Sequence, residues 1–357
     1  MITLSLLLAL AFDLDPHQLV RIEVTPPRVL ITTPFDSSQL LVTGERADGA
    51  KIDLTGEVEV LSAPGFIEIT PSLLLRPLGD GVGSIKIRAN GRTLSVPVRT
   101  TGSRSKTTPD FELDIQPILT RIGCNAGTCH GSAQGKDGFF LSLRGYDAQA
   151  DHLALTDDLA SRRVNLAAPR KSLFLQKPTG AVPHRGGQVL DPSSSDYSHL
   201  LRWVESGAPY GGETAKLESI RVEPSDPTIQ LAGGTQQFRV LATYVGGKER
   251  DVTSHAFLEP GDIEILSVNE TGKATALRRG EAPILVRYHG QYAATTVFVL
   301  GDREGWEWEG DPTNNYIDEL VHAKLKKVNV STSGLCDDAD FLRRVHFDLT
   351  GQAPSPA

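Results

Sequence analysis

The spacing of apolar residues divides the chain into strand-like and helix-like parts. At residues 85–88 and again at 284–287, β-branched residues lie between glycine-containing turns, a pattern typical of short strands. Further runs of this kind follow at intervals of roughly 8 to 12 residues, the spacing expected of a two-sheet sandwich. Between residues 108 and 212 the apolar residues take up the period of a helix. The pattern predicts two β-rich parts with a helical segment between them.

The two β-rich parts repeat one unit. Pro26 and Pro224 lie 198 positions apart, and the triplets Asp53-Leu54-Thr55 and Asp251-Val252-Thr253 keep the same offset. Through this triplet and an opening I-x-V-x-P, the copies resemble bacterial immunoglobulin-like domains, with expected boundaries at 17–101 and 216–301. The resemblance implies β-sandwiches that serve as spacers or adhesive units.

Two amphipathic helices are predicted for the middle segment, residues 108–212. Thr108-Pro109 is a typical N-cap and N1 pair, and apolar residues spaced for one helix face follow it: Phe111, Ile115, Ile118 and Ile122. A second set follows the polar residues 193–196, which can cap a helix: Tyr197, Leu200, Leu201 and Val204. We expect the first and last helices of this segment to pack together.

Composition and charge narrow the class of protein. The chain has 36 Lys and Arg against 44 Asp and Glu, and a net charge of −8 argues against a general nucleic-acid partner. No run reaches the roughly 18 to 20 apolar residues that span a bilayer, so no membrane span is expected. Residues 1–12 form an apolar run ending in Ala9-Leu10-Ala11, which predicts a secretory signal; a frayed N-terminus is the alternative. We expect export to the periplasm or the cell surface.

The candidate chemistry lies in the sequence CNAGTCHG, which contains Cys124, Cys129 and His130. The usual c-type haem attachment sequence is C-x-x-C-H, whereas four residues separate the cysteines here. Two thiols must reach the two vinyl groups of one porphyrin while the adjacent imidazole binds the iron, and Gly127 offers the freedom that a longer loop needs. The motif predicts one covalent haem c with His130 as the proximal ligand.

Two other interpretations of this motif stay open. Cysteines five positions apart in an exported protein often form a disulfide, here Cys124–Cys129. Zinc would need four ligands, and only Cys124, Cys129 and His130 are close in sequence. The remaining cysteine, Cys336, is expected to be buried or unpaired rather than reactive.

The middle segment and the C-terminus resemble parts of large, exported planctomycete proteins. Residues 110–210 are similar to their cytochrome c-like domain at residues 114–119, 124–131, 200–204 and 207–209. Residues 312–357 are similar to the beginning of a downstream domain of unknown function, at residues 316–318, 342–344, 348–351 and 354. The resemblance implies covalent haem, electron transfer and a truncated C-terminal domain.

The distal side of the expected iron needs a second ligand. Met1 is the chain's single methionine, and Val182 stands where a distal methionine would lie, so His184 is the candidate distal ligand. An exposed loop histidine, with five-coordinate iron, is the alternative. His152 and His199 are weaker candidates for this ligand. Four arginines are candidate partners for the haem propionates: Arg144, Arg162, Arg163 and Arg185.

The expected fold is therefore multidomain, with two all-β immunoglobulin-like sandwiches flanking an all-α cytochrome c-like domain and a partial helical segment at the C-terminus. The expected function is one-electron transfer by an exported c-type cytochrome, with an unidentified redox protein as partner, and the chain is a carrier rather than a catalyst. Two alternatives stay open. One is a haem component of a larger enzyme, and the other is a structural or adhesive cell-surface protein with a Cys124–Cys129 disulfide.

Overall fold

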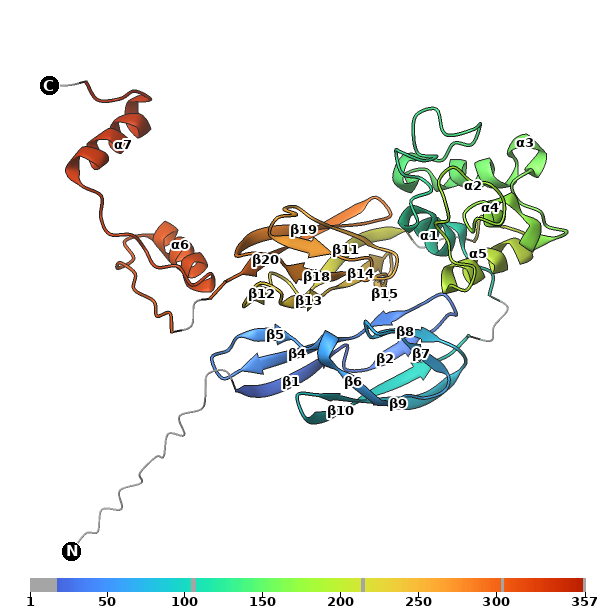
Figure 1. Ribbon diagram of the computed structural model, residues 1–357, viewed down its shortest axis with the longest axis horizontal. Helices are drawn as coiled ribbons and strands as arrows, with labels where there is room; N and C mark the ends of the chain where they lie inside the picture. The colour runs from blue at the N-terminus through green and yellow to red at the C-terminus, as the bar shows by residue number, and fades with distance from the viewer. Residues whose placement is uncertain (1–17, 104–106, 213–215, 303–304, 356–357) are drawn as a thin grey trace, which may run out of the picture. The chain divides into compact units, whose positions relative to one another are not determined.

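The computed structural model describes residues 18–103, 107–212, 216–302 and 305–355 (Figure 1). Two compact units follow one another along the chain, Met1–Val299 and Leu300–Ala357. The first unit is built mainly from strands, and the second contains two helices. The expected secretory segment, residues 1–12, lies outside the described residues.

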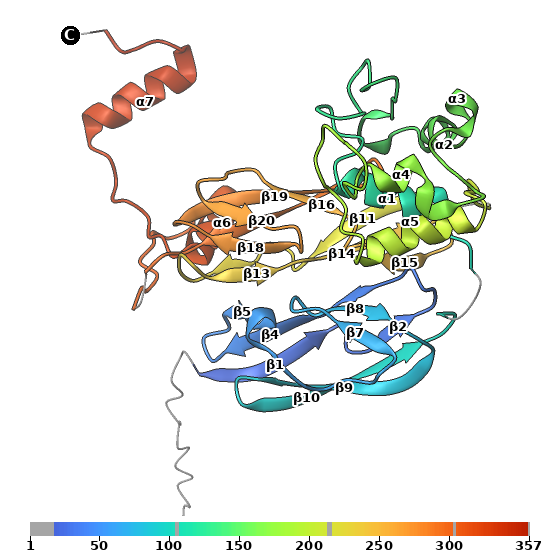
Figure 2. The same ribbon diagram turned by 45° about the vertical axis from the view of Figure 1, so that its right-hand side comes forward.

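The first copy of the repeat folds into three small sheets with the strand orders β1-β4-β5, β2-β10-β9-β6 and β3-β8-β7. Its strands are β1 (Leu19–Thr25), β2 (Val29–Ile31), β3 (Ser38–Gln39), β4 (Leu41–Arg46), β5 (Lys51–Asp53), β6 (Glu59–Ser62), β7 (Ile67–Ile69), β8 (Leu74–Pro77), β9 (Gly81–Ala89) and β10 (Arg92–Thr100). A 3-10 turn, η1 (Thr55–Glu57), follows β5. Strands β9 and β10 run side by side as a long hairpin (Figure 2).

The second copy repeats this arrangement strand for strand, with the orders β11-β14-β15, β12-β20-β19-β16 and β13-β18-β17. Its strands are β11 (Leu217–Glu223), β12 (Thr228–Ile229), β13 (Thr235–Gln237), β14 (Arg239–Tyr244), β15 (Lys248–Asp251), β16 (Phe257–Pro260), β17 (Leu266–Val268), β18 (Lys273–Ala276), β19 (Gly280–Tyr288) and β20 (Gln291–Val299). In both copies one strand pairing is parallel, β2 with β10 and β12 with β20. The repeat recognised at an offset of 198 residues is therefore a repeat of three-dimensional structure.

Local sequence explains why each long hairpin turns where it does. Asn90-Gly91 connects β9 to β10, and His289-Gly290 connects β19 to β20, with positive φ at all four residues. Two central residues with positive φ are characteristic of the type I′ turn, whose twist matches that of a hairpin. Alternate residues of each hairpin then face the interior, so the sheets of each copy enclose one hydrophobic core.

A third hydrophobic core lies in the segment between the copies. Its helical elements are η2 (Phe111–Ile115, a π-helical turn), α1 (Gln116–Arg121), η3 (Leu143–Gly145), α2 (Ala148–Thr156), α3 (Asp158–Ser161), η4 (Pro169–Lys171), α4 (Leu173–Gln176) and α5 (Ser195–Glu205). Apolar residues from η2, α1 and α5 share this core, so the expected packing of the first helical stretch against the last is confirmed. Ser194 caps α5 through its side-chain oxygen, whereas Asp110 rather than Thr108 caps the first stretch.

The expectation of an all-α cytochrome c-like domain at residues 108–212 is wrong. Most helical elements of this segment last one or two turns, and long irregular stretches connect them. Closely spaced glycines account for much of this, because Gly123, Gly135, Gly138 and Gly145 all adopt positive φ, which a right-handed helix does not permit. The described chain is mainly β, with short helical elements between its two β-rich copies.

The second unit contains α6 (Tyr316–Lys327) and α7 (Asp338–Thr350). Asn315 and Asp337 cap the two helices, and Gly351 ends α7 in the left-handed conformation. A helical C-terminal segment was expected here. Across residues 18–103, 107–212, 216–302 and 305–355, no helix combines the length and the apolar character needed to cross a bilayer.

Candidate functional site

The predicted chemistry lies on one tight loop, residues 123–131, which we call the Cys–His loop. It follows α1, and backbone hydrogen bonds hold its conformation. The N–H of Cys124 donates to the carbonyl of Leu119 (2.9 Å), and the N–H of His130 donates to the carbonyl of Cys124 (3.0 Å). The carbonyl of His130 in turn accepts from Leu141 (2.9 Å). Because these bonds tie the loop to the elements on both sides of it, the position of the His130 ring is set by the fold.

The glycine that this loop requires is Gly131 rather than Gly127. A Cβ atom on Gly131 would overlap the carbonyl oxygen of Asn125, so only glycine fits there without moving the backbone. A Cβ atom on Gly127 would make an ordinary contact with Leu143 at 3.6 Å. The expectation that Gly127 supplies the loop's special freedom is therefore wrong, and the glycine after His130 carries that requirement.

His130 and His184, the two histidines considered as iron ligands, lie near each other in the structure. Their ring centroids are 6.4 Å apart and their planes differ by 13°. Nδ1 of His130 hydrogen-bonds with the carbonyl of Phe139 (3.0 Å), and Nδ1 of His184 with the carbonyl of Gly187 (2.8 Å). Burial is the main cause that lowers the pKa of His130, and the nearby His184 lowers it further.

Cys124 and Cys129 are both free thiols, and so is the exposed Cys336. The Cys124–Cys129 disulfide considered from sequence is thus not formed in this structure. Burial, together with the neighbouring Cys129, raises the pKa of Cys124 to about 12, so this thiol stays protonated at neutral pH. The part of the chain that the structure describes contains no group of three or more metal-ligating side chains, so the zinc interpretation gains no support from it. Covalent haem at these cysteines stays a prediction.

The other histidines considered as iron ligands lie elsewhere. Nε2 of His152 bonds to the carbonyl of Ala208 (2.8 Å), and its ring packs edge-on against Phe111. His199 packs edge-on against Phe35, with 5.1 Å between ring centroids. Both rings therefore serve packing, which is the ordinary role of a partly buried histidine.

The four arginines considered as propionate partners differ in their surroundings. Arg163 is buried, lies 4.4 Å from the centroid of the Phe139 ring, and donates to the carbonyls of Ala154 (2.7 Å) and Gly138 (2.9 Å). It supports the stretch that holds His130. The other three arginines are exposed: Arg144, Arg162 and Arg185.

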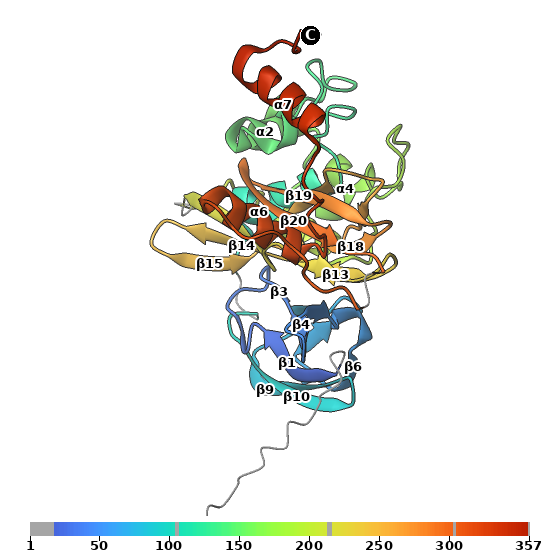
Figure 3. The same ribbon diagram turned by 90° about the vertical axis from the view of Figure 1, so that its left-hand side faces the viewer.

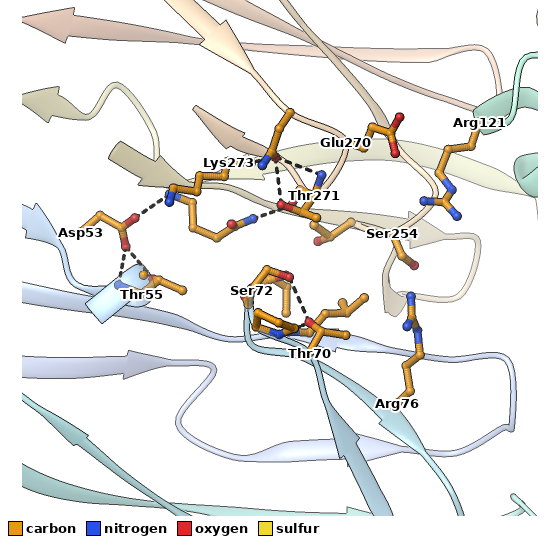
Figure 4. Close-up of a pocket in the computed structure, with 17 residues that line it drawn as sticks. Asp53, Thr55, Thr70, Ser72, Arg76, Arg121, Ser254, Glu270, Thr271 and Lys273 are labelled. Carbon is orange, nitrogen blue, oxygen red and sulfur yellow. Dashed lines mark hydrogen bonds between the residues drawn. The ribbon is translucent and has the colours of Figure 1, made fainter. Parts of the chain in front are cut away.

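A second set of polar residues lies between the two copies, and it uses the triplet by which the repeat was recognised. Oδ1 of Asp53 accepts hydrogen bonds from the backbone N–H (3.0 Å) and hydroxyl (2.5 Å) of Thr55. Oδ2 of Asp53 accepts from the backbone N–H of Gln237 in the other copy (2.7 Å). One carboxylate thus closes its own turn and reaches across to the second sandwich (Figure 4).

Asp251 of the second copy makes the equivalent hydrogen bonds. Oδ1 of Asp251 accepts from the N–H (3.1 Å) and hydroxyl (2.7 Å) of Thr253, and Oδ2 accepts from the N–H of Gln39 in the first copy (2.8 Å). Arg239 also donates to Oδ2 through Nε (2.8 Å). Because Gln39 and Gln237 are themselves separated by the repeat offset, the interface is pseudo-twofold symmetric.

A cavity of about 420 Å³ lies beside these contacts and is lined by both copies. Figure 4 shows Asp53 and Thr55 toward one end of it and Arg76 and Arg121 toward the other. Burial raises the pKa of Asp53, although hydrogen bonds from Thr55 and Gln237 oppose the shift. Arg121, which lines the cavity, forms an ion pair with Asp196 within the middle segment.

Arg250 connects all three cores of the first unit. It belongs to β15 of the second copy, the strand that pairs with β14 (Figure 3). Its guanidinium pairs with Asp36 of the first copy (2.7 Å) and with Asp114 of the middle segment (2.7 Å), and it donates to the carbonyl of Phe35 (3.2 Å). Burial alone would lower the pKa of Arg250, but the carboxylates of Asp114 and Asp36 hold it above its ordinary value.

Partly buried histidines near Arg250 give the first unit a predicted sensitivity to acid. Burial, with a further contribution from Arg250, lowers the pKa of His289 to about 4, whereas an unfolded histidine titrates near 6.5. Below about pH 6.5 the unfolded chain binds this proton and the folded chain does not, so stability falls as the pH drops toward 4. For His289 alone we expect a loss of up to about 3 kcal/mol, measured as the free energy of unfolding in urea at pH 7, 5.5 and 4.5.

The matched variant for this prediction comes from the repeat itself. His289 occupies a turn position with positive φ, and its counterpart in the first copy is Asn90. His289→Asn therefore removes the titrating ring and keeps a residue that tolerates the turn. We expect the variant to lose less stability on acidification than the original chain. If the two proteins lost equal stability on acidification, His289 would not be a source of the acid sensitivity. The sensitivity would then come from other histidines, such as His199 and His255, whose pKa values burial also lowers.

Sequence reasoning missed Arg250 and the role of the triplet. The partners of Arg250, Asp36 and Asp114, are far from it along the chain, so no local pattern connects them. A usable signal was its position directly before Asp251, the first residue of the repeated triplet. A charged residue beside a repeat signature is a candidate for the interface between repeats.

Comparison with known proteins adds three findings. Residues 316–357 match the sequence profile of a family described as a protein of unknown function (DUF1549). Ice-binding protein 1 of Shewanella frigidimarina (strain NCIMB 400) is 27% identical over 124 residues, which is 35% of this chain and 14% of that protein. This chain therefore spans only a small part of the curated relative that it matches.

Among solved structures, domains 5–6 of the S-layer protein SbsC are 13% identical and align over 80% of this chain and 99% of theirs, with a TM-score of 0.30. Extracellular domains 3–5 of Drosophila OTK are 6% identical over 78% of this chain and 60% of theirs, with a TM-score of 0.16. At these scores the alignments do not establish a shared fold.

These findings overturn the interpretation of the chain as an electron-transferring c-type cytochrome of planctomycete type. The family match covers only the C-terminal segment and is to a domain of unknown function, and the curated relative is an ice-binding protein. The segment between the β-rich copies is not an all-α domain. Of the interpretations considered from sequence, a structural protein of the cell surface fits these findings better.

Proposed function

We propose that this chain is a structural protein of the cell exterior. Its two β-sandwich copies form one scaffold, and the scaffold holds the middle segment, residues 108–212. The observation that carries the proposal is the reciprocal pair of contacts in which Asp53 and Asp251 each accept a backbone N–H from the opposite copy. A pair of spacer domains joined only by a linker would not need carboxylates that bond across to the opposite domain.

Arg250 supports the same proposal for the middle segment. A guanidinium that is paired with Asp36 and Asp114 at once holds the first copy, the second copy and the middle segment in one arrangement. Breaking a buried ion pair costs several kcal/mol, because an uncompensated charge is left behind. The middle segment is thereby fixed to the scaffold at the start of its first helical stretch.

An exterior location is supported by the sequence and by one relative. The apolar segment at residues 2–12 has the character of a secretory signal. The partial relative is a protein named for binding ice. We extend neither its ligand nor its activity to this chain.

The scaffold is tested by pulling on single molecules held at engineered attachment points near residues 18 and 302. We expect the original chain to unfold its two sandwiches in one coupled event, since each copy holds the other's hydrogen bonds. The double variant Asp53→Asn/Asp251→Asn should unfold them in two separate events at lower force. Two independent events in the original chain would overturn the scaffold.

The location is tested on intact cells of the native host. Protease added outside the cells should release peptides from residues 216–299, which antibodies or mass spectrometry would detect. A cytoplasmic protein of the same host serves as the control for lysis. Release of these peptides only after lysis, together with the control protein, would overturn the exterior location.

A further inference from the structure

We propose that the cavity between the two copies binds a small acidic sugar, whose carboxylate lies against Arg76. The inference rests on the proposed scaffold, because residues of both copies line the cavity. The cavity measures about 420 Å³, which falls within the range of about 300–1,000 Å³ typical of small-molecule sites. Its lining therefore decides which class of molecule it accepts.

Equivalent residues of the two copies line this cavity in pairs. Gln39 and Gln237 are one such pair, and the side-chain amide of each donates to a carbonyl in the turn that precedes β8 or β18. The strand register continues the correspondence, since Gln39 pairs with Leu74 and Gln237 pairs with Lys273. Much of the wall therefore follows from the repeat and from the docking of its copies.

Two cations of the lining depart from the repeat. Lys273 of the second copy stands where the first copy has Leu74, and Arg76 of the first copy stands where the second has Thr275. The reciprocal hydrogen bonds that join the copies involve neither cation. The docking of the sandwiches therefore does not explain why a lysine and an arginine line the cavity.

Both cations keep the capacity to bind a ligand. Within the described residues Lys273 forms no ion pair, and Arg76 forms a single one, with Glu68 at 3.9 Å. A guanidinium binds a carboxylate most strongly through two parallel hydrogen bonds of about 2.7–2.9 Å. The carboxylate of a ligand can therefore approach Arg76 more closely than Glu68 does.

The two ends of the cavity differ in what they can bind. A Cβ atom placed on Gly56 would lie 3.6 Å from Nζ of Lys273, so this ammonium lies beside the turn that follows Asp53. Figure 4 shows Asp53 toward this end of the cavity and Arg76 and Arg121 toward the other. A second carboxylate beside Asp53 would be repelled, because like charges disfavour one another. The carboxylate of a ligand therefore belongs at the arginine end, and its uncharged part lies toward Lys273.

The rest of the lining suits a molecule that carries hydroxyl groups. Hydroxyl side chains are the commonest kind in the wall: Thr55, Thr70, Ser72, Thr253, Ser254 and Thr271. Thr271 donates to Asn269 (2.9 Å), which leaves its oxygen able to accept from a ligand. An apolar ligand would leave such groups without partners, at a cost in free energy. A sugar acid combines the hydroxyl groups and the single negative charge that the two ends and the wall accept.

The experiment titrates the full chain at constant ionic strength with methyl glucuronide and, separately, with methyl glucoside and with sodium sulfate, following heat by calorimetry. The two sugars share one ring and differ in the carboxylate. We expect one glucuronide per chain, bound about tenfold or more tightly than the glucoside. Arg76→Thr, which installs the residue of the second copy, should abolish this preference, whereas Lys273→Leu should weaken both sugars. Arg88→Thr, exposed on β9 and outside the lining, is the matched control and should bind as the original chain does.

A preference for the glucuronide that is lost in Arg76→Thr and kept in Arg88→Thr supports the site. Equal binding of the two sugars, no binding of the glucuronide, or an unchanged preference in Arg76→Thr would overturn it. Sulfate bound as tightly as the glucuronide would overturn the sugar as the ligand. Circular dichroism of each variant establishes that it is folded, so a loss of binding is not a loss of structure.

The scaffold and the cavity site can fail separately. A chain whose sandwiches unfold in one coupled event under force, but which binds no glucuronide, contradicts the cavity site alone. Two separate unfolding events contradict the scaffold, and with it the cavity that the docked copies enclose.

Discussion

Replacing Arg250 by Met should lower the free energy of unfolding by about 3–5 kcal/mol, because the change leaves two carboxylates buried without their counter-charge. The side chains of Asp36 and Asp114 are 15% and 10% exposed, and Arg250 lies 2.7 Å from each. Met keeps most of the volume of Arg, so the loss reports on charge rather than on a cavity. Urea unfolding at pH 7, followed by tryptophan fluorescence and by circular dichroism, measures it.

The control is an arginine of the same copy whose ion pair is exposed. Arg278 pairs with Glu264 at 2.7 Å, but the two side chains are 58% and 73% exposed. Exposed pairs contribute about 0–1 kcal/mol, so Arg278→Met should unfold close to the original chain. If the two variants differed by less than about 1 kcal/mol, the central role given to Arg250 would be wrong.

The second large effect is expected at the pseudo-twofold interface. Asp251→Ala removes the acceptor for the backbone N–H of Gln39, for both donors of Thr253 and for Nε of Arg239. A buried donor left without a partner costs about 1–3 kcal/mol, so we expect a total loss of about 3–5 kcal/mol. Urea unfolding under the same conditions gives the value.

The equivalent residue of the first copy provides the comparison. Asp53 makes the same bonds to Thr55 and Gln237, but no arginine among the described residues donates to it. Asp53→Ala should therefore cost less than Asp251→Ala by about 1 kcal/mol, since Asp251→Ala also removes one of the two carboxylates that pair with Arg239, the other being Glu223. An equal or reversed order would show that the interface energy does not come from these carboxylates.

Much of the β structure could be predicted from local sequence. Alternation and glycine turns indicated the long hairpins, and the offset of 198 residues indicated that both copies would fold alike. These features depend on neighbouring residues, for which a single sequence is informative. The same holds for the cap at Ser194 and for the apolar face of α5.

The contacts between copies could not be predicted, because they join residues far apart in the chain. The triplet D-[LV]-T was recognised as a sign of repetition. In each copy, however, one oxygen of its aspartate bonds within the copy and the other bonds to the opposite copy, and the second bond depends on how the sandwiches dock. The pairing of Arg250 with Asp36 and Asp114 is of the same kind. Local patterns contain no information on which distant carboxylate fills a buried position.

The error in the middle segment has a related cause. The helical spacing at residues 111–122 and 197–204 correctly predicted helical structure there. The cytochrome c-like domain, however, was inferred only from these two helical stretches and the motif of Cys124, Cys129 and His130. The glycines between them adopt positive φ and break the helical pattern into short pieces. His130 and His184 do lie near each other, with 6.4 Å between ring centroids, but their predicted role as ligands stays a prediction.

The reciprocal interface also sets an order of events during synthesis. The hydrogen bond from the N–H of Gln237 to Asp53 cannot form until Gln237 has been synthesised, 184 residues further along the chain. At about 5–20 residues per second, a ribosome needs roughly 10–40 s to make that partner. Throughout that interval the first sandwich exposes a buried face of the finished protein. A nascent chain of this kind is exposed to proteases and to wrong partners until its second half has emerged.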